Sequence, residues 1–261
     1  MFSVMFFLLV GATAGLIAGL FGIGGGVVIV PALIMTLDQL GVDPTVVVHL
    51  AIGTSLAIIT VTGASSALGH WKKNAVSTKL LSQMLPGLVL GAVCGGVIAD
   101  HLQAERLEQY FGIFMLALSL WMMFSKPTES RQYHANSPVM VAAGTLIGGF
   151  SALFGVGGGV LNVPWLTRNG ADLSQAIGTS AACGFPIAAV GAATFIATGQ
   201  DESMLPVYTS GYLYWPAFLG IAISSIPCAR LGANLAHYLQ AKLLKRLFAI
   251  LMLLVGLKLI L

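Results

Sequence analysis

The chain carries very few charged residues. Only 8% of its 261 residues are Asp, Glu, Lys or Arg, against roughly 25% in a typical soluble domain. Its 12 basic and 9 acidic residues give a net charge of +3, which is too sparse for a surface that follows the phosphates of a nucleic acid. Hydrophobic residues make up 57% of the chain, and the mean hydropathy is +0.92. This composition excludes a soluble globular enzyme, a disordered chain and a nucleic-acid-binding protein. It predicts an all-α polytopic protein of the lipid bilayer.

Side chains that carry chemistry are scarce inside the apolar segments. The three cysteines, Cys94, Cys183 and Cys228, lie in apolar runs without the spacing of metal ligands, and we expect buried free thiols. All nine acidic residues lie in loops or at their edges, and the apolar runs contain no nucleophile–base pair and no pair of carboxylates. The sequence therefore predicts no enzyme activity, no cofactor and no metal site. It gives no support for proton coupling through a buried carboxylate.

Eight long runs of the sequence contain no charged residue. They are 1–37, 44–71, 80–99, 109–125, 132–167, 173–200, 203–229 and 247–257. A helix rises ~1.5 Å per residue and crosses a bilayer core of ~30 Å with about 20 residues, so runs 1–37 and 132–167 are too long for one span. Each of these two runs has a glycine cluster near its middle. We therefore predict that each forms a hairpin of helices broken at the glycines, with about three further transmembrane helices after it.

The sequence contains an internal repeat. Residues 11–33 align without gaps on residues 144–166, which pairs two Gly-x-Gly-Gly-Gly clusters and the prolines that follow them. The motif Ile-Gly-Thr-Ser then recurs at 52–55 and at 177–180. The predicted organisation is a first transmembrane repeat at 1–125, a cytoplasmic linker at 126–137 and a second transmembrane repeat at 138–261.

Loop charges predict that the two repeats cross the membrane in opposite directions. Cytoplasmic loops retain Lys and Arg, and matched loops differ in basic content: the loop with Lys72, Lys73 and Lys79 corresponds to one with Asp201 and Glu202. If each half crosses five times, the cytoplasmic loops are 72–79, 126–131, 168–172 and 242–246. The loops 38–43, 100–108 and 201–202, and both termini, are then external to a cell inner membrane.

The glycine clusters predict helix breaks. A dinucleotide-binding loop would need a preceding strand, whereas these clusters follow long apolar runs. Gly11, Gly15 and Gly19, upstream of the first cluster, are also compatible with close helix packing. Three consecutive glycines cost a helix roughly 1 kcal/mol each relative to alanine, and a break exposes amide N–H groups that favour anions. Paired, interrupted segments in two inverted halves are typical of a transporter site at the membrane midplane.

Polar side chains near the breaks have alternative interpretations. The hydroxyls of the Ile-Gly-Thr-Ser motifs either face a substrate or bond to carbonyls of their own helices. Asn162 replaces Ile29 of the first repeat, and we interpret it as a ligand or an interhelical contact. Arg230 either reaches the cytoplasmic interface or contacts an anion.

The doubled glycine cluster followed by proline, with Ile-Gly-Thr-Ser after each copy, resembles the sulfite exporter TauE/SafE family, also called the 4-toluene sulfonate uptake permease family. The resemblance covers nearly the whole chain. It implies a prokaryotic inner-membrane transporter of small anions such as sulfite, sulfoacetate and other organosulfonates, with some members linked to carboxylates. Carried over to this sequence together with the polar residues above, the expected substrate-binding residues are Gly24, Gly25, Gly26, Thr54, Ser55, Gly157, Gly158, Gly159, Asn162, Thr179 and Ser180, with Arg230 as a further anion contact.

The sequence therefore predicts a secondary transporter whose partners are a small anion and the lipid bilayer. A passive anion channel and a carboxylate transporter of the same fold remain alternatives, as does a membrane enzyme or assembly subunit. Homo-oligomerisation is compatible with the sequence, which fixes neither the substrate nor the direction of transport.

Overall fold

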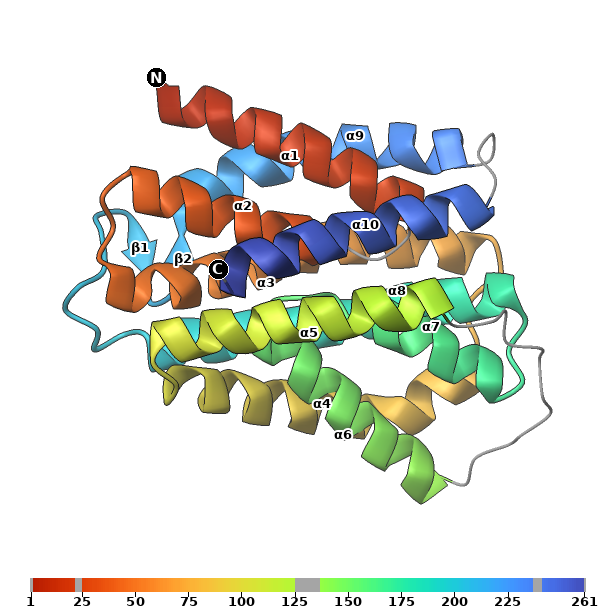
Figure 1. Ribbon diagram of the computed structural model, residues 1–261. Coiled ribbons are helices and arrows are strands. Elements are labelled where there is room, and N and C mark those ends of the chain that lie inside the picture. The colour runs from red at the N-terminus through yellow and green to blue at the C-terminus, as the bar shows by residue number, and fades with distance from the viewer. Residues whose placement is uncertain (1, 22–24, 125–136, 237–240, 261) are drawn as a thin grey trace.

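The computed structural model describes residues 2–21, 25–124, 137–236 and 241–260, which form ten helices and one two-stranded hairpin (Figure 1). The first five helices are α1 (Phe2–Phe21), α2 (Gly26–Gln39), α3 (Pro44–Lys72), α4 (Thr78–Asp100) and α5 (Ala104–Phe124). The other five are α6 (Ser137–Leu153), α7 (Gly159–Arg168), α8 (Leu173–Thr198), α9 (Trp215–Ala236) and α10 (Ala241–Ile260). Strands β1 (Thr209–Ser210) and β2 (Leu213–Tyr214) pair antiparallel between α8 and α9. The linker predicted at 126–137 lies outside the described residues except for Ser137.

Both predicted helix breaks are present. The residues that cap the outgoing helices α2 and α7 are Gly25, with φ 78°, and Gly158, with φ 71°. These are left-handed conformations that a side chain disfavours, which explains why the breaks form at glycines. The 14 residues of α2 and the 10 of α7 span roughly 21 Å and 15 Å, less than a bilayer core of ~30 Å. Each break therefore lies at depth within the helical bundle rather than at its surface.

Several of the helices have the length and hydropathy of membrane spans. Among the described residues, four helices are long and apolar enough to cross a bilayer, namely α3, α4, α5 and α8. The helix α3 is buried continuously from Val46 to Ile59, as expected of a helix that is apolar on all sides and lies at the centre of a bundle. The predicted all-helical polytopic architecture is thus confirmed, while the short β1–β2 hairpin was not predicted.

The connections between helices gather at two opposite ends of the molecule (Figure 1). Turns 40–43 and 101–103 and segment 199–214 lie at the end where α1 begins, and α10 runs toward this end. We call it the termini end. Turns 73–77 and 169–172 lie at the opposite end, where α5 ends and α6 begins. We call that the linker end. Both α3 and α8 start with a capping aspartate, because Asp43 accepts from Thr45 N at 2.9 Å and Asp172 accepts from Gln175 N at 2.7 Å.

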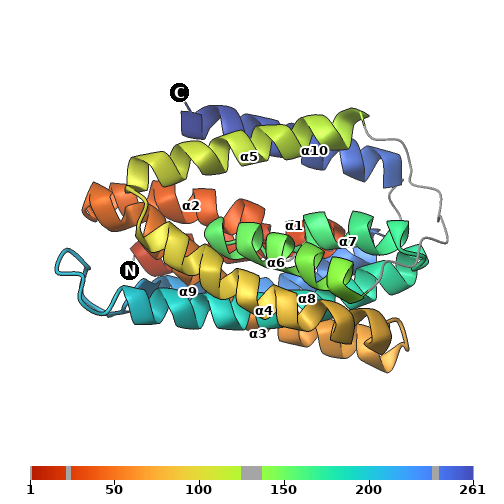
Figure 2. The ribbon, with the colours of Figure 1, turned by 90° about the horizontal axis from the view of Figure 1, so that it is seen from below.

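The most extensive helix contacts join the two halves of the chain. Helix α1 packs on α9, while its sequence counterpart α6 packs on α4; α3 packs on α8, and α5 on α10 along one outer face (Figure 2). Glycines allow these close approaches. A Cβ at Gly11 or Gly15 would overlap backbone atoms of Ile221 or Ser225 on α9. The prediction of close helix packing is therefore confirmed at these two glycines.

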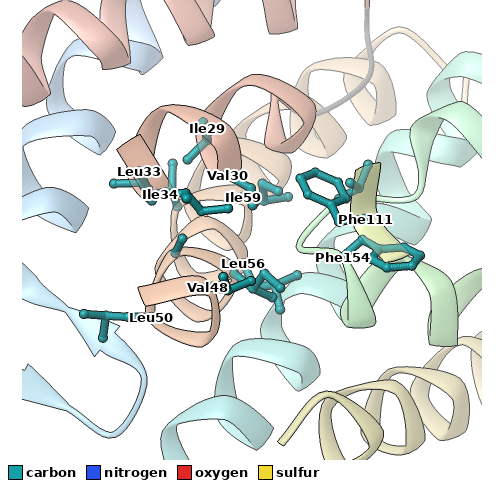
Figure 3. Packing of buried hydrophobic residues seen from close by; sticks show 14 of the residues in the cluster. Ile29, Val30, Leu33, Ile34, Val48, Leu50, Leu56, Ile59, Phe111 and Phe154 are labelled. Carbon is teal, nitrogen blue, oxygen red and sulfur yellow. The ribbon is translucent and has the colours of Figure 1, made fainter. Parts of the chain in front are cut away.

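An aromatic cluster fixes the chain just before the second break. The ring of Phe154, which directly follows α6, lies 5.7 Å from the ring of Phe111 and 4.6 Å from that of Phe114, both on α5. Figure 3 shows Phe111 and Phe154 beside Val30 of α2 and Ile59 of α3. Because these side chains come from four separate elements, they hold the second break against the first repeat.

The three cysteines differ in exposure. All are free; Cys183 is buried, Cys228 is half-buried and Cys94 is exposed. The expectation of buried thiols is thus confirmed for Cys183 and wrong for Cys94, which lies on the outward face of α4. An outward face of a membrane helix meets lipid, so a small apolar side chain is suited to either place.

Candidate substrate site at the helix breaks

The two helix breaks contact each other. A Cβ at Gly26 would overlap the carbonyl oxygen of Gly155, and a Cβ at Gly155 would lie 2.9 Å from Val30 Cγ2 of α2. The hydroxyl of Ser55, fully buried on α3, donates to the Gly155 carbonyl at 2.9 Å. The structure therefore brings together Gly26 and Ser55 of the first repeat and the glycine cluster of the second.

The threonines of the two Ile-Gly-Thr-Ser motifs make equivalent bonds. Thr54 accepts from the backbone N–H of Tyr214 at 3.0 Å, and Thr179 accepts from the backbone N–H of Ser77 at 2.9 Å. Tyr214 and Ser77 directly precede α9 and α4, and both threonine side chains are fully buried. The two hydroxyls thus hold the residue before α9 at the termini end and the residue before α4 at the linker end. Each bond joins one repeat to the other, whereas we had expected contact with a substrate or with the threonine's own helix.

The glycines of the same motifs allow the segments that precede α9 and α4 to approach α3 and α8 closely. A Cβ at Gly53 would overlap the carbonyl oxygen of Tyr212, and a Cβ at Gly178 would overlap that of Ala75. Tyr212 also hydrogen-bonds Asp100, and burial together with the negative charges of Asp100 and Glu202 raises the pKa of its phenol above the usual value. The phenol therefore stays protonated and donates to the carboxylate.

The second break is surrounded by buried polar atoms without hydrogen-bond partners. Asn162 is 0% exposed, and neither its Oδ1 nor its Nδ2 has a partner. The hydroxyls of Ser151 and Ser180 and the indole N–H of Trp165 are likewise buried and unpartnered. Native proteins pair the great majority of their buried polar atoms. Such a concentration therefore marks a place that a ligand can complete.

Two of these side chains lie at the N-terminus of α7. Asn162 Nδ2 lies 2.9 Å, and Ser151 Oγ 3.3 Å, from the point where a Cβ of Gly158 would stand. Trp165 follows Asn162 by three residues, which places both on one face of α7. The first N–H groups of a helix have no acceptor within it, so the Gly158 cap adds backbone donors to the side chains. We call Ser151, Asn162, Trp165 and Ser180 the polar cluster.

Helix α8 supplies the remaining wall of the polar cluster. Ile187 Cδ1 lies 2.9 Å from the same Gly158 point, and a Cβ at Gly184 would lie 2.7 Å from the carbonyl oxygen of Gly157. Ser180 is four residues before Gly184, so both lie on the face of α8 that meets the break. The hydroxyl of Ser180 thus lies one helical turn from the glycine contact.

The first break lacks an equivalent set of polar side chains. In the alignment of the repeats, Ser151, Asn162 and Trp165 correspond to Ala18, Ile29 and Ala32. Ile29 is only 2% exposed and belongs to the apolar core. The two breaks are alike in backbone and different in chemistry.

Neutral groups form the surroundings of the polar cluster. Helices α6 and α8 contain no charged residue, and the charges nearest in sequence, Arg168 and Asp172, are exposed at the linker end. The described residues include no group of three or more His, Cys, Asp or Glu side chains that could hold a metal ion. The site therefore offers hydrogen-bond donors and the positive end of a helix, which favour an anion.

The other predicted site residues have limited or different roles. Gly25, Gly157 and Gly159 contribute backbone to the breaks, whereas Gly24 and the side chain of Arg230 lie outside the described residues. Sequence reasoning did not include Ser151. The signal was available, because Ser151 pairs with Ala18 in the alignment and so differs between the repeats as Asn162 and Ile29 do.

Two hollows lie near opposite ends of the bundle. The one at the termini end has a volume of about 340 Å³ and is lined by Ile34, Met35, Asp38, Gln39, Pro44, Val47, Val48, Glu108 and Lys258. The one at the linker end has a volume of about 200 Å³ and is lined by Ser77, Lys79, Leu80, Gln83, Met140, Asn169, Gly170, Ala171 and Gln175. Neither is lined by a residue of the polar cluster, so the cluster is separated from both hollows in this conformation.

Comparison with known proteins relates nearly the whole chain to one family. The family model described as "Sulfite exporter TauE/SafE" matches residues 7–259. A probable membrane transporter protein of Haemophilus influenzae is 36% identical over 97% of both chains. The probable membrane transporter protein YunE of Bacillus subtilis is 29% identical over 99% of this chain and 97% of its own. A probable membrane transporter protein of Methanocaldococcus jannaschii is 27% identical over 91% of this chain and 88% of its own.

Proposed function

Because the chain belongs to the sulfite exporter TauE/SafE family and is a multi-pass membrane transporter of that family, we propose that it is a secondary transporter of small oxyanions. The substrate is sulfite, an organosulfonate or a related sulfur oxyanion, and the membrane is the cell inner membrane. The observation that carries this proposal is the polar cluster of unpartnered, buried groups around Asn162 at the N-terminus of α7.

The chemistry of the polar cluster suits oxyanions. The Asn162 amide, the Trp165 indole, the two serine hydroxyls and the backbone N–H groups of α7 are all donors, and they can surround the oxygens of a sulfonate or sulfite. A cation would instead need several oxygen ligands. Because the donors belong to rigid helices α6, α7 and α8, they are oriented before the ligand binds, which reduces the entropic cost of binding.

We propose further that the two repeats are inverted in the membrane and that the substrate crosses between the two hollows. The exchange of helix partners between the halves supports this arrangement, as do the opposite positions of the matched turns (Figure 1). Lys79 at the linker-end hollow attracts anions. Since the polar cluster is separated from both hollows, each side must open in turn, as in alternating access.

The proposed orientation places the linker end in the cytoplasm, because its turns carry Lys72, Lys73 and Arg168. A reporter fused after Leu261 is therefore expected to read as external. The measurement compares an enzyme reporter that is active only outside the cytoplasm with a fluorescent one that folds only inside. A cytoplasmic signal from the full-length fusion would invert this orientation. A reporter placed in turn 73–77 serves as the internal control and should give the opposite reading.

Ligand-dependent thermal unfolding of the purified full-length protein tests the substrate class. Sulfite, methanesulfonate, thiosulfate and acetate are compared with chloride at equal ionic strength. A ligand present at about 100 times its Kd stabilises the folded state by about 2.7 kcal/mol, which corresponds to an increase in Tm of about 5 to 10 °C for a chain of this size. Stabilisation by at least one of the three sulfur oxyanions supports the proposal.

Other outcomes of this measurement count against the sulfur oxyanion. Stabilisation by acetate alone would favour the carboxylate transporter instead. If no anion stabilises the protein, the polar cluster is not an anion-binding site. Uptake into proteoliposomes then separates a transporter from a passive channel, because transporter flux saturates as the anion concentration rises.

A further inference from the structure

We propose that the polar cluster selects its substrate by charge state, taking an anion with a single negative charge and rejecting dianions. This inference rests on the proposed function, and it concerns the same site. It follows from what surrounds Asn162 rather than from the identity of any one sulfur compound.

The first observation is that, among the side chains that the structure describes, no fixed cation adjoins the polar cluster. The side chains of the polar cluster are an amide, an indole and two hydroxyls, and all are at least 90% buried or have fully buried polar atoms. Helices α6 and α8, which enclose the cluster, contain no charged residue. The nearest cation on α7 is Arg168, which is exposed six residues after Asn162, roughly 9 Å along the helix. Within α6, α7 and α8, a bound anion therefore has no cationic side chain beside it.

The second observation is that, with the N-terminus of α2 packed against Gly155 and Val156, the polar cluster adjoins one positive helix end. Its strength is equivalent to roughly +0.5 elementary charge, and it comes from α7, whose Gly158 cap faces Asn162 and Ser151. The electrostatic cost of burying an ion grows with the square of its charge, so a dianion costs about four times as much to bury as a monoanion of equal size. One helix end and neutral donors match the smaller charge.

The third observation is that the first break does not complete the site for a second charge. Its positions 18, 29 and 32 carry alanine, isoleucine and alanine, and Ser55 already donates to the carbonyl of Gly155. Among the described residues, the unpartnered side-chain donors around the breaks thus belong to the second repeat. They suffice for the oxygens of one sulfonate group.

Binding as a function of pH tests this inference on the purified full-length protein. The probes are methanesulfonate, which is a monoanion at any neutral pH, sulfite, which loses its second proton near neutral pH, and sulfate, which is a dianion. We expect methanesulfonate affinity to be constant from about pH 6 to about pH 8 while the apparent Kd of sulfite rises roughly tenfold, because only its monoanion binds. Sulfate should not bind.

The outcomes separate this inference from the proposed function. Sulfate binding as tightly as methanesulfonate, or sulfite affinity independent of pH, would overturn charge selection and leave oxyanion binding intact. Methanesulfonate affinity that falls in parallel with sulfite affinity would also overturn it, because a protein group would then be responsible. The titratable side chain in the enclosing helices α6 and α8 is the buried thiol of Cys183. If none of the three probes binds, the result contradicts the proposed function itself.

Discussion

Replacement of Asn162 by leucine is expected to abolish anion binding and transport while making the folded protein more stable. Leucine has the same number and branching of side-chain heavy atoms as asparagine, although its methyl groups occupy more space, and it would replace the amide at a fully buried position. The substitution removes two polar atoms that have no partner, and an unsatisfied buried polar group costs about 1–3 kcal/mol. We therefore expect the free energy of unfolding to increase by about that amount.

The measurement combines thermal unfolding in detergent with uptake into proteoliposomes. The matched control is Ile29→Leu, at the aligned position of the first repeat, where the side chain belongs to the apolar core. A volume-conserving change of this kind usually costs less than about 1.5 kcal/mol, and transport should be retained. If Asn162→Leu transports normally, Asn162 is not a substrate ligand. If it lowers Tm, the amide supports the fold instead.

The general fold was predictable because its signals are local in the sequence. Charged residues mark the ends of helices, and runs of glycine mark the breaks, so the sequence alone predicts the order of the helices. The structure adds that Gly25 and Gly158 are the capping residues. The β1–β2 hairpin was not predictable in this way. It lies in segment 199–214, where Gly211 has φ 53° and a Cβ would overlap the carbonyl oxygen of Ile196, a contact that depends on the packed structure.

The roles of the motif hydroxyls depend on contacts between residues far apart in the sequence. The sequence marks Thr54 and Thr179 as polar residues in apolar runs, and they recur at equivalent places. Their partners, Tyr214 and Ser77, lie 160 and 102 residues away, and no periodicity identifies them. The repeat itself favoured a symmetric site, whereas the unpartnered groups gather at the second break. The positions at which the aligned repeats differ, rather than those at which they agree, distinguish the polar break from the apolar one.

Replacement of Gly178 by alanine is expected to destabilise the protein strongly without adding any polar group. The new Cβ would overlap the carbonyl oxygen of Ala75. That turn cannot easily move, because Ala75 N donates to His70 O at 3.0 Å and Ser77 N donates to Thr179 at 2.9 Å. Overpacking against fixed backbone costs typically 1–3 kcal/mol and occasionally more, and we expect about 3 kcal/mol here. This corresponds to a decrease in Tm of about 6–12 °C, measured by thermal unfolding in detergent.

Gly69→Ala on α3 is the matched control, since a Cβ there meets no atom within 4 Å. Alanine is a better helix former than glycine by up to about 1 kcal/mol, so this variant should unfold at the same or a slightly higher temperature. If Gly178→Ala behaves like Gly69→Ala, the turn at 73–77 is not held against α8. If it unfolds early while Gly69→Ala does not, close approach between the repeats at the linker end is required for stability. Gly178 and Thr179 of the Ile-Gly-Thr-Ser motif then act as a structural clamp, while Ser180 of the same motif belongs to the polar cluster.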